Sequence, residues 1–109
     1  MTETQTETPV LDLLASMTAD SVAVSSLDAE SLMLVRIAAL VALDAPAVSY
    51  LLNLAAAADV GVDADRVRGV LSAIAPIVGT PRVASATGRI ADALEVAIEV
   101  LEMDDEDDV

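Results

Sequence analysis

The sequence predicts an all-α protein, and three observations support this prediction. The apolar residues are almost all Ala, Val, Leu and Ile, with Tyr50 the one aromatic residue among 109. Small aliphatic side chains suit close-packed helices better than a sandwich or a barrel. N-cap and turn residues also divide the chain into helix-length segments, and apolar residues recur at helical spacing near its end. We therefore expect a buried helical hairpin followed by a long C-terminal amphipathic helix.

The first part of the chain predicts a leader and a short helix. Residues 1–8 repeat Thr and Glu with nothing to bury, which indicates a disordered leader. Pro9 suits the first turn of a helix that extends to about Met17, and residues 18–26 then predict a loop. We expect this segment to form a strap over the core.

The middle of the chain predicts the hairpin. Asp28 is a suitable N-cap for a helix that runs to about Leu43 and is apolar on almost every face. A second apolar helix starts near Pro46, continues to Ala58 and stops at Gly61, the residue type expected just after a helix end. Helices that are apolar all round are buried, so we expect this pair to form the centre of the protein.

Two further helices complete a single domain, which we expect over residues 9–103. Asp63 caps a helix that runs to about Ile77. The acidic run in residues 104–109 repels itself and predicts a disordered tail. The last helix is expected from Pro81 to Leu101, with an apolar stripe formed by Val83, Ala86, Ile90, Leu94, Ala97, Ile98 and Leu101.

Charge and hydropathy exclude several kinds of partner. The chain has five basic residues, all Arg, and nineteen acidic residues. The formal net charge of −14 argues against nucleic acid and anionic membranes as partners. The longest apolar stretch, residues 32–43, is shorter than the roughly 18 residues that a membrane-spanning helix needs. The first residues are polar and acidic rather than basic and then apolar, so we expect no signal peptide and a cytoplasmic location.

The residue types that the chain lacks narrow its chemistry. Without cysteine or histidine, disulfides, thiol redox chemistry, zinc–thiolate sites and imidazole catalysis are excluded. We expect no catalytic residue, no metal site and no cofactor. The composition is nevertheless 55% hydrophobic, with a mean hydropathy of +0.62. A lone domain of this size cannot cover so much apolar surface, so we expect the chain to assemble with copies of itself.

The order of these signals is similar to that of a known family. Leu27-Asp28 precedes the first apolar helix, Gly61-Val62-Asp63 follows the second, and Leu71-Ser72-Ala73-Ile74 leads to Gly79-Thr80-Pro81 before the amphipathic helix. Over about residues 27–100 this pattern resembles the carboxymuconolactone decarboxylase family, which includes the AhpD-like alkylhydroperoxidases. The resemblance implies an AhpD-like helical domain and a homo-oligomer, typically a trimer or a hexamer.

The residues that carry this family's chemistry are replaced. Peroxidase-type members open the third helix with Cys-x-x-Cys-x-x-x-His, whose positions fall on Pro46, Ser49 and Asn53 here. The upstream glutamate that usually serves the proton relay in these members falls on Met33 or Leu34. The decarboxylase branch instead has a glutamate and a histidine at the positions of Ser49 and Asn53. Serine cannot replace the thiolate that attacks a peroxide, so thiol peroxidase chemistry is excluded. An acid/base step at these positions would lack its titrating groups.

Four residues form the candidate ligand-binding site: Ser49, Asn53, Tyr50 and Arg36. Ser49 and Asn53 are four apart, so they share one face of an apolar helix beside Tyr50. They predict either a neutral hydrogen-bonding site for a small ligand, or a structural pair satisfied by each other, by backbone carbonyls or by a subunit contact. Arg36 lies in the middle of an apolar helix, where it pairs with a carboxylate, reaches the rim of an interface or binds an anion.

Two functions from different classes remain open. The first is a non-catalytic pseudo-enzyme of this family, acting as a homo-oligomeric scaffold, a regulator or a binder of a small hydrophobic ligand. The second is a cysteine-independent enzyme of the family, of the decarboxylase and lactone type or peroxide-related. It would use Ser49 and Asn53 on a small hydrophobic carbonyl or peroxide substrate.

Overall fold

The computed structural model describes residues 8–108, so residues 1–7 of the expected leader and Val109 of the expected tail lie outside it. The side chains of Ala97, Val100 and residues 101–108 also lie outside the description. Within residues 8–108 the chain consists of helices and their connections without a strand, which confirms the all-α prediction. The helices are α2 (Pro9–Val24), α3 (Ala29–Leu43), α4 (Ala47–Asp59), α5 (Ala64–Val78) and α6 (Thr80–Asp108).

Helices α3 and α4 form a hairpin where the sequence predicts it. The Asp28 carboxylate accepts a hydrogen bond from the Ser31 N–H at 2.7 Å, which satisfies a donor that the first turn of α3 leaves free. Asp44 ends α3 in the left-handed conformation, with φ 56°. Gly61, with φ 94°, follows the end of α4, where only a residue without a Cβ adopts such a backbone without strain.

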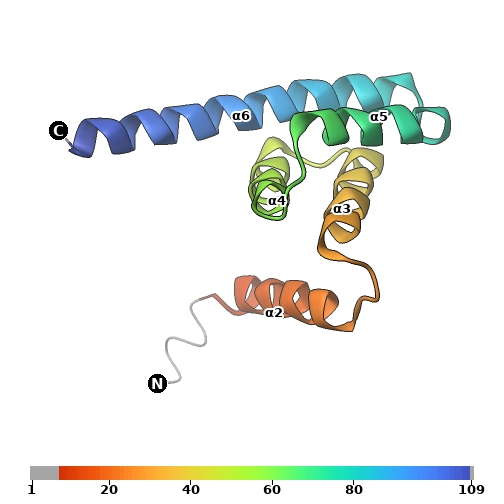
Figure 1. Ribbon diagram of the computed structural model, residues 1–109, viewed down its shortest axis with the longest axis horizontal. Coiled ribbons are helices and arrows are strands. Elements are labelled where there is room, and N and C mark those ends of the chain that lie inside the picture. Colours follow the sequence, from red (N-terminus) through yellow and green to blue (C-terminus); the bar gives the residue numbers. More distant parts are fainter. Residues whose placement is uncertain (1–7, 109) are drawn as a thin grey trace.

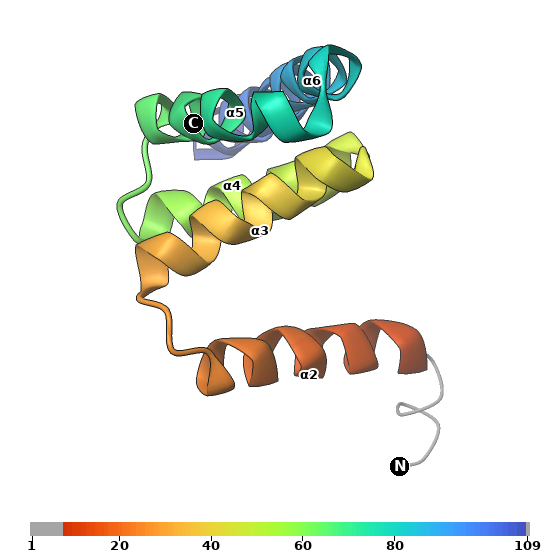
Figure 2. The ribbon, with the colours of Figure 1, turned by 90° about the vertical axis from the view of Figure 1, so that its right-hand side faces the viewer.

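Helices α5 and α6 lie against one side of this hairpin (Figures 1 and 2). Ile37 of α3 belongs to one core cluster with Val67 of α5, and Val41 of α3 belongs to another with Ala86 of α6. Ile37 and Val41 are fully buried, whereas Leu43 at the end of α3 is 76% exposed. A single chain therefore buries one side of the hairpin and leaves apolar side chains uncovered elsewhere.

The first helix is longer than the sequence predicts, and it does not lie over the core as expected. Helix α2 continues to Val24, so the prediction of a loop from residue 18 is wrong up to that point. Residues 18–24 contain no Gly or Pro, and a helix that has already formed extends at little cost until a residue stops it. Ser25 then takes an extended conformation, and α2 stands apart from the hairpin with none of its residues buried (Figure 2). The prediction of a strap over the core is therefore also wrong.

Helix α6 continues to Asp108, beyond the predicted end at Leu101. Its backbone is helical where a disordered tail was expected from residue 104. The physical reason is the same as for α2: each residue added to an existing helix gains a backbone hydrogen bond without a new nucleation step.

The predicted apolar stripe of α6 is buried only where this helix crosses the hairpin. Ala86 is buried and Ile90 is partly buried in the core clusters, whereas Leu94 and Ile98 are exposed. The later part of α6 projects beyond the hairpin (Figure 1). This part of α6 therefore exposes apolar side chains, in addition to those that the hairpin leaves uncovered.

Candidate functional site

An open cleft between α2 and the hairpin brings together two of the four predicted site residues, Arg36 and Asn53. Its volume is about 560 Å³. One face of α2 forms a wall, because the four contributing residues of this helix recur at helical spacing. The lining residues are Leu14, Met17, Thr18 and Ser21 of α2, Arg36, Ala39 and Leu40 of α3, and Leu52, Asn53 and Ala56 of α4.

Arg36 connects the hairpin to α2 across this cleft. One terminal guanidinium nitrogen, Nη2, donates hydrogen bonds to the Thr18 carbonyl oxygen at 3.3 Å and to Ser21 Oγ at 3.0 Å. Both acceptors are neutral. Among the described side chains no carboxylate pairs with Arg36, in contrast to Arg66, which pairs with Glu30. Of the alternatives that the sequence left open, carboxylate pairing is therefore not observed in the described part of the chain.

Asn53 reaches the cleft from α4. Its side-chain Nδ2 donates a hydrogen bond to the Ser49 carbonyl oxygen at 2.9 Å, one turn earlier in the same helix. Ser49 itself is partly buried and does not line the cleft. The two residues are thus linked through a backbone carbonyl, which is one of the structural arrangements that their spacing predicts.

Tyr50 lies away from the other predicted site residues. Its side chain is fully buried in the core cluster that includes Val41 and Ala86, between the hairpin and α6. The hydroxyl oxygen is buried and makes no hydrogen bond to any described residue. Burial raises the pKa of this phenol above its ordinary value, and the nearby Asp44 charge acts in the same direction, so the group stays neutral at physiological pH. The structure does not bring Tyr50 to the cleft.

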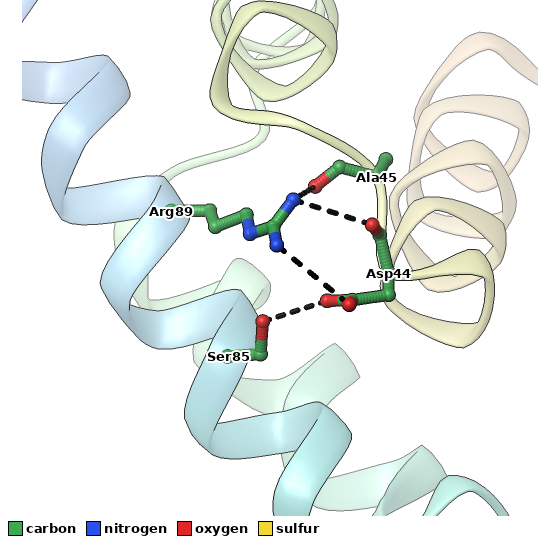
Figure 3. A network of polar contacts seen from close by, with 4 residues as sticks. All are labelled: Asp44, Ala45, Ser85 and Arg89. Atoms are coloured by element: carbon green, nitrogen blue, oxygen red, sulfur yellow. Dashed lines mark hydrogen bonds and ion pairs between the residues drawn. The ribbon is translucent and has the colours of Figure 1, made fainter.

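A polar cluster that the sequence analysis missed joins the corner of the hairpin to α6 (Figure 3). The Ser85 hydroxyl donates a hydrogen bond to Asp44 Oδ1 at 2.6 Å. Arg89 Nη1 donates to the backbone oxygens of Ala45 at 2.9 Å and Asp44 at 3.3 Å, and Arg89 Nη2 lies 3.7 Å from Asp44 Oδ2. The guanidinium thus binds the backbone oxygens of the residue that ends α3 and of the residue after it, which lie beyond the hydrogen-bond ladder of the helix.

One local signal could have indicated this cluster. Ser85 and Arg89 are four residues apart, so they share a face of α6. Their partner Asp44 is more than forty positions earlier, with separations of 41 and 45 residues, and no pattern in the sequence joins the two segments. The hydrogen bond from Ser85 holds the pKa of the Asp44 carboxyl below its ordinary value; the charge of Arg89 adds to this effect and desolvation opposes it.

A second apolar cavity, of about 420 Å³, lies between the end of α4, α5 and α6. Leu54, Val67, Leu71 and Ile90 form much of its wall. None of the four predicted site residues contributes to it. This cavity is therefore separate from the cleft beneath α2.

The side chains around the cleft limit the chemistry that it can perform. The lining residues include none of the His, Asp, Glu, Lys, Tyr or Cys side chains that serve as general acids or bases. General acid or base catalysis needs a group that exchanges its proton, and nucleophilic catalysis needs an activated nucleophile beside a base. The arrangement is suited to binding through apolar contacts and hydrogen bonds.

Comparison with other proteins does not identify a relative. No family model matches the chain, and neither a curated protein nor a solved structure gives a significant match. In the described part of the chain, no three His, Cys, Asp or Glu side chains are grouped closely enough to hold a metal ion. Within residues 8–108, each helix is too short or too polar to span a bilayer.

Proposed function

We propose that this protein is a non-catalytic, homo-oligomeric, AhpD-like helical protein that binds a small hydrophobic ligand in the cleft between α2 and the hairpin. The observation that carries the proposal is the cleft itself. Arg36 and Asn53, two polar residues predicted from the sequence, meet there on walls that are otherwise mostly apolar.

The size and composition of the cleft support a binding role. Its volume of about 560 Å³ falls within the roughly 300–1,000 Å³ that is usual for small-molecule sites. Such sites combine apolar walls with a few polar groups that fix the orientation of the ligand. Leu14 and Met17 on α2 face Leu40 and Leu52 on the hairpin in this way. The absence of a titratable base among the lining residues favours binding over catalysis.

The exposed apolar surface supports self-assembly. No residue of α2 is buried, and its large aliphatic side chains are between 50% and 83% exposed. Burial of one such side chain contributes about 1.5–3 kcal/mol, so covering several of them is a strong drive for association. The family resemblance adds the expectation of a trimer or a hexamer. Of the exposed side chains of α2, Leu14 and Met17 line the cleft, which leaves Val10, Leu11, Leu13, Val22 and Val24 for a subunit contact.

Two measurements on the purified protein test this proposal. Native mass spectrometry should detect an oligomer that carries a small apolar molecule, which organic extraction releases and mass spectrometry identifies. Assays with an organic hydroperoxide and with a lactone acid should both give background rates. A compact monomer without ligand, or robust turnover in either assay, would contradict the proposal.

A further inference from the structure

We infer that the ligand of this cleft is an amphipathic anion, an aliphatic monocarboxylate whose charged head group binds Arg36 and whose chain lies between α2 and the hairpin. This inference rests on the proposed binding function and specifies the chemical class of the ligand. It concerns the same cleft and the same two polar residues, Arg36 and Asn53.

The charge of Arg36 is the first argument. The chain has a net charge of −14 and five basic residues. Three of these, Arg66, Arg68 and Arg89, already pair with carboxylates. Arg36 instead contacts neutral acceptors on α2, and no described carboxylate neutralises it. A cation in a partly apolar site gains most from an anion that enters with its own apolar body.

The unused donors of Arg36 are the second argument. A guanidinium carries five N–H donors in a fixed plane. The two observed hydrogen bonds both start from Nη2, so Nε and Nη1 make no hydrogen bond within the described residues. Either of these nitrogens can donate a hydrogen bond to one carboxylate oxygen while Nη2 keeps its bonds to Thr18 and Ser21. The ligand would therefore bind without breaking the link between α2 and α3.

The walls of the cleft are the third argument. Leu14, Met17, Leu40 and Leu52 supply aliphatic surface, and no aromatic side chain is present to stack on a planar ligand. Asn53 commits Nδ2 to the Ser49 carbonyl, which leaves its side-chain oxygen and second N–H for a polar substituent. One cation with an aliphatic wall fits a singly charged, chain-like molecule better than a phosphate ester or a dicarboxylate.

Three ligands that share an alkyl chain and differ in head-group charge test this inference by titration calorimetry. The probes are decanoate, decanol and decyltrimethylammonium, used below their aggregation limits. We expect decanoate to bind about ten-fold or more tightly than decanol, the size expected for one charge-assisted hydrogen-bonded contact. Non-specific attraction to an acidic protein would instead favour the cation. A preference for decyltrimethylammonium, or equal binding of decanoate and decanol, overturns the inference.

Matched variants locate the head group. Arg36→Gln also removes the two hydrogen bonds that hold α2, so the change in decanol affinity measures any effect on the wall of the cleft. Beyond that change, decanoate binding should weaken about ten-fold or more. Arg36→Lys should retain part of the preference for the anion. Arg66→Gln removes the same charge from the exposed pair with Glu30 and should leave both affinities unchanged. An equal loss in Arg36→Gln and Arg66→Gln would overturn the assignment to Arg36.

A cleft variant separates this inference from the function on which it rests. Leu52→Gln places a polar group in the apolar wall and should weaken decanoate and decanol alike. If neutral alkyl ligands bind in a Leu52-dependent manner without preference for the anion, the proposed function stands and the anion inference fails. If no alkyl ligand binds, both fail.

Discussion

Arg89 of α6 donates a hydrogen bond to the backbone oxygen of Asp44, the left-handed residue that ends α3. The same guanidinium also donates to the Ala45 oxygen and faces the Asp44 carboxylate (Figure 3). A side chain of one helix thus caps the end of another and fixes the corner of the hairpin against α6. This contact, together with the apolar packing of Val41 against Ala86, joins the hairpin to α6.

Removing this cap should destabilise the fold. We expect Arg89→Met to lower the free energy of unfolding by about 1–3 kcal/mol, because loss of the guanidinium leaves the carbonyls of Asp44 and Ala45 without their charged donor. Chemical denaturation with circular dichroism measures the change. Arg68→Met removes an arginine whose pair with Asp65 on α5 is exposed, and it should have little effect. Equal stability of Arg89→Met and the wild type would show that the cap is dispensable.

The Asp44 carboxylate should make stability depend on pH on the acid side. The hydrogen bond from Ser85 lowers the folded-state pKa of Asp44 below its ordinary 3.8. A lowered folded-state pKa adds stability above the unfolded-state value, and this stability is lost as pH falls through the folded-state pKa. The contribution of Asp44 to the unfolding free energy should therefore be constant near neutral pH and decline below about pH 4.

Replacing Ser85 isolates the contribution of Asp44. Ser85→Ala removes the largest cause of the lowered Asp44 pKa, so it should reduce the decline in unfolding free energy on acidification. Asp28 also has a lowered pKa, through its hydrogen bonds from Ser31, but it is unchanged in this variant and cancels in the comparison. Ser72→Ala, at an exposed site on α5, serves as the control. Identical acid profiles for Ser85→Ala and the wild type would contradict the prediction.

Removing the buried hydroxyl of Tyr50 should not harm the protein. This oxygen is fully buried without a hydrogen-bond partner among the described residues, and such a group costs about 1–3 kcal/mol. We expect Tyr50→Phe to be as stable as the wild type, or more stable by about 1–2 kcal/mol. Tyr50→Ala should lose about 3–5 kcal/mol, because it opens a cavity in the core. Marked destabilisation by Tyr50→Phe in thermal unfolding would reveal a partner for the hydroxyl.

A substitution of Asn53 distinguishes a role in ligand binding from a role in stability. Asn53→Leu removes a side-chain hydrogen bond to the Ser49 carbonyl, which also belongs to the backbone ladder of α4 and is not left without a donor. The expected change in unfolding free energy is below about 1 kcal/mol. Ligand binding, measured by calorimetry, should be abolished if Asn53 orients the ligand. Retained affinity with a shifted melting temperature would make Asn53 a structural residue only.

The exposed face of α2 should control assembly. The double variant Leu13→Gln, Val24→Gln removes two large exposed aliphatic side chains at one edge of the cleft-lining face of α2. We expect it to raise the dissociation constant of the oligomer about ten-fold or more. Light scattering over a concentration series measures this change. Ile77→Gln removes an 85% exposed side chain on α5 and should leave assembly intact; dissociation in this control instead would place the interface on α5.

The sequence by itself determined that the chain folds into helices and where most of them begin. Asp28 and Asp63 cap α3 and α5 through contacts to N–H groups three residues later. These signals act within one turn of helix, so local chemistry is sufficient to specify them. The same locality explains the two wrong ends: no residue near position 18 stops α2, and none near Leu101 stops α6. The run of acidic residues, which was expected to end the last helix, does not end it.

Only the tertiary structure decided which faces of the helices meet. Asn53 and Tyr50 are three residues apart on one helix, yet Asn53 lines the cleft and Tyr50 enters the core. On a helix that is apolar nearly all round, the hydropathy pattern cannot tell these faces apart. The contact between Arg89 and Asp44 joins positions that are 45 residues apart, and the separation of α2 from the hairpin depends on the extended conformation at Ser25. Such relationships arise from packing between helices, to which residues distant in the sequence contribute together.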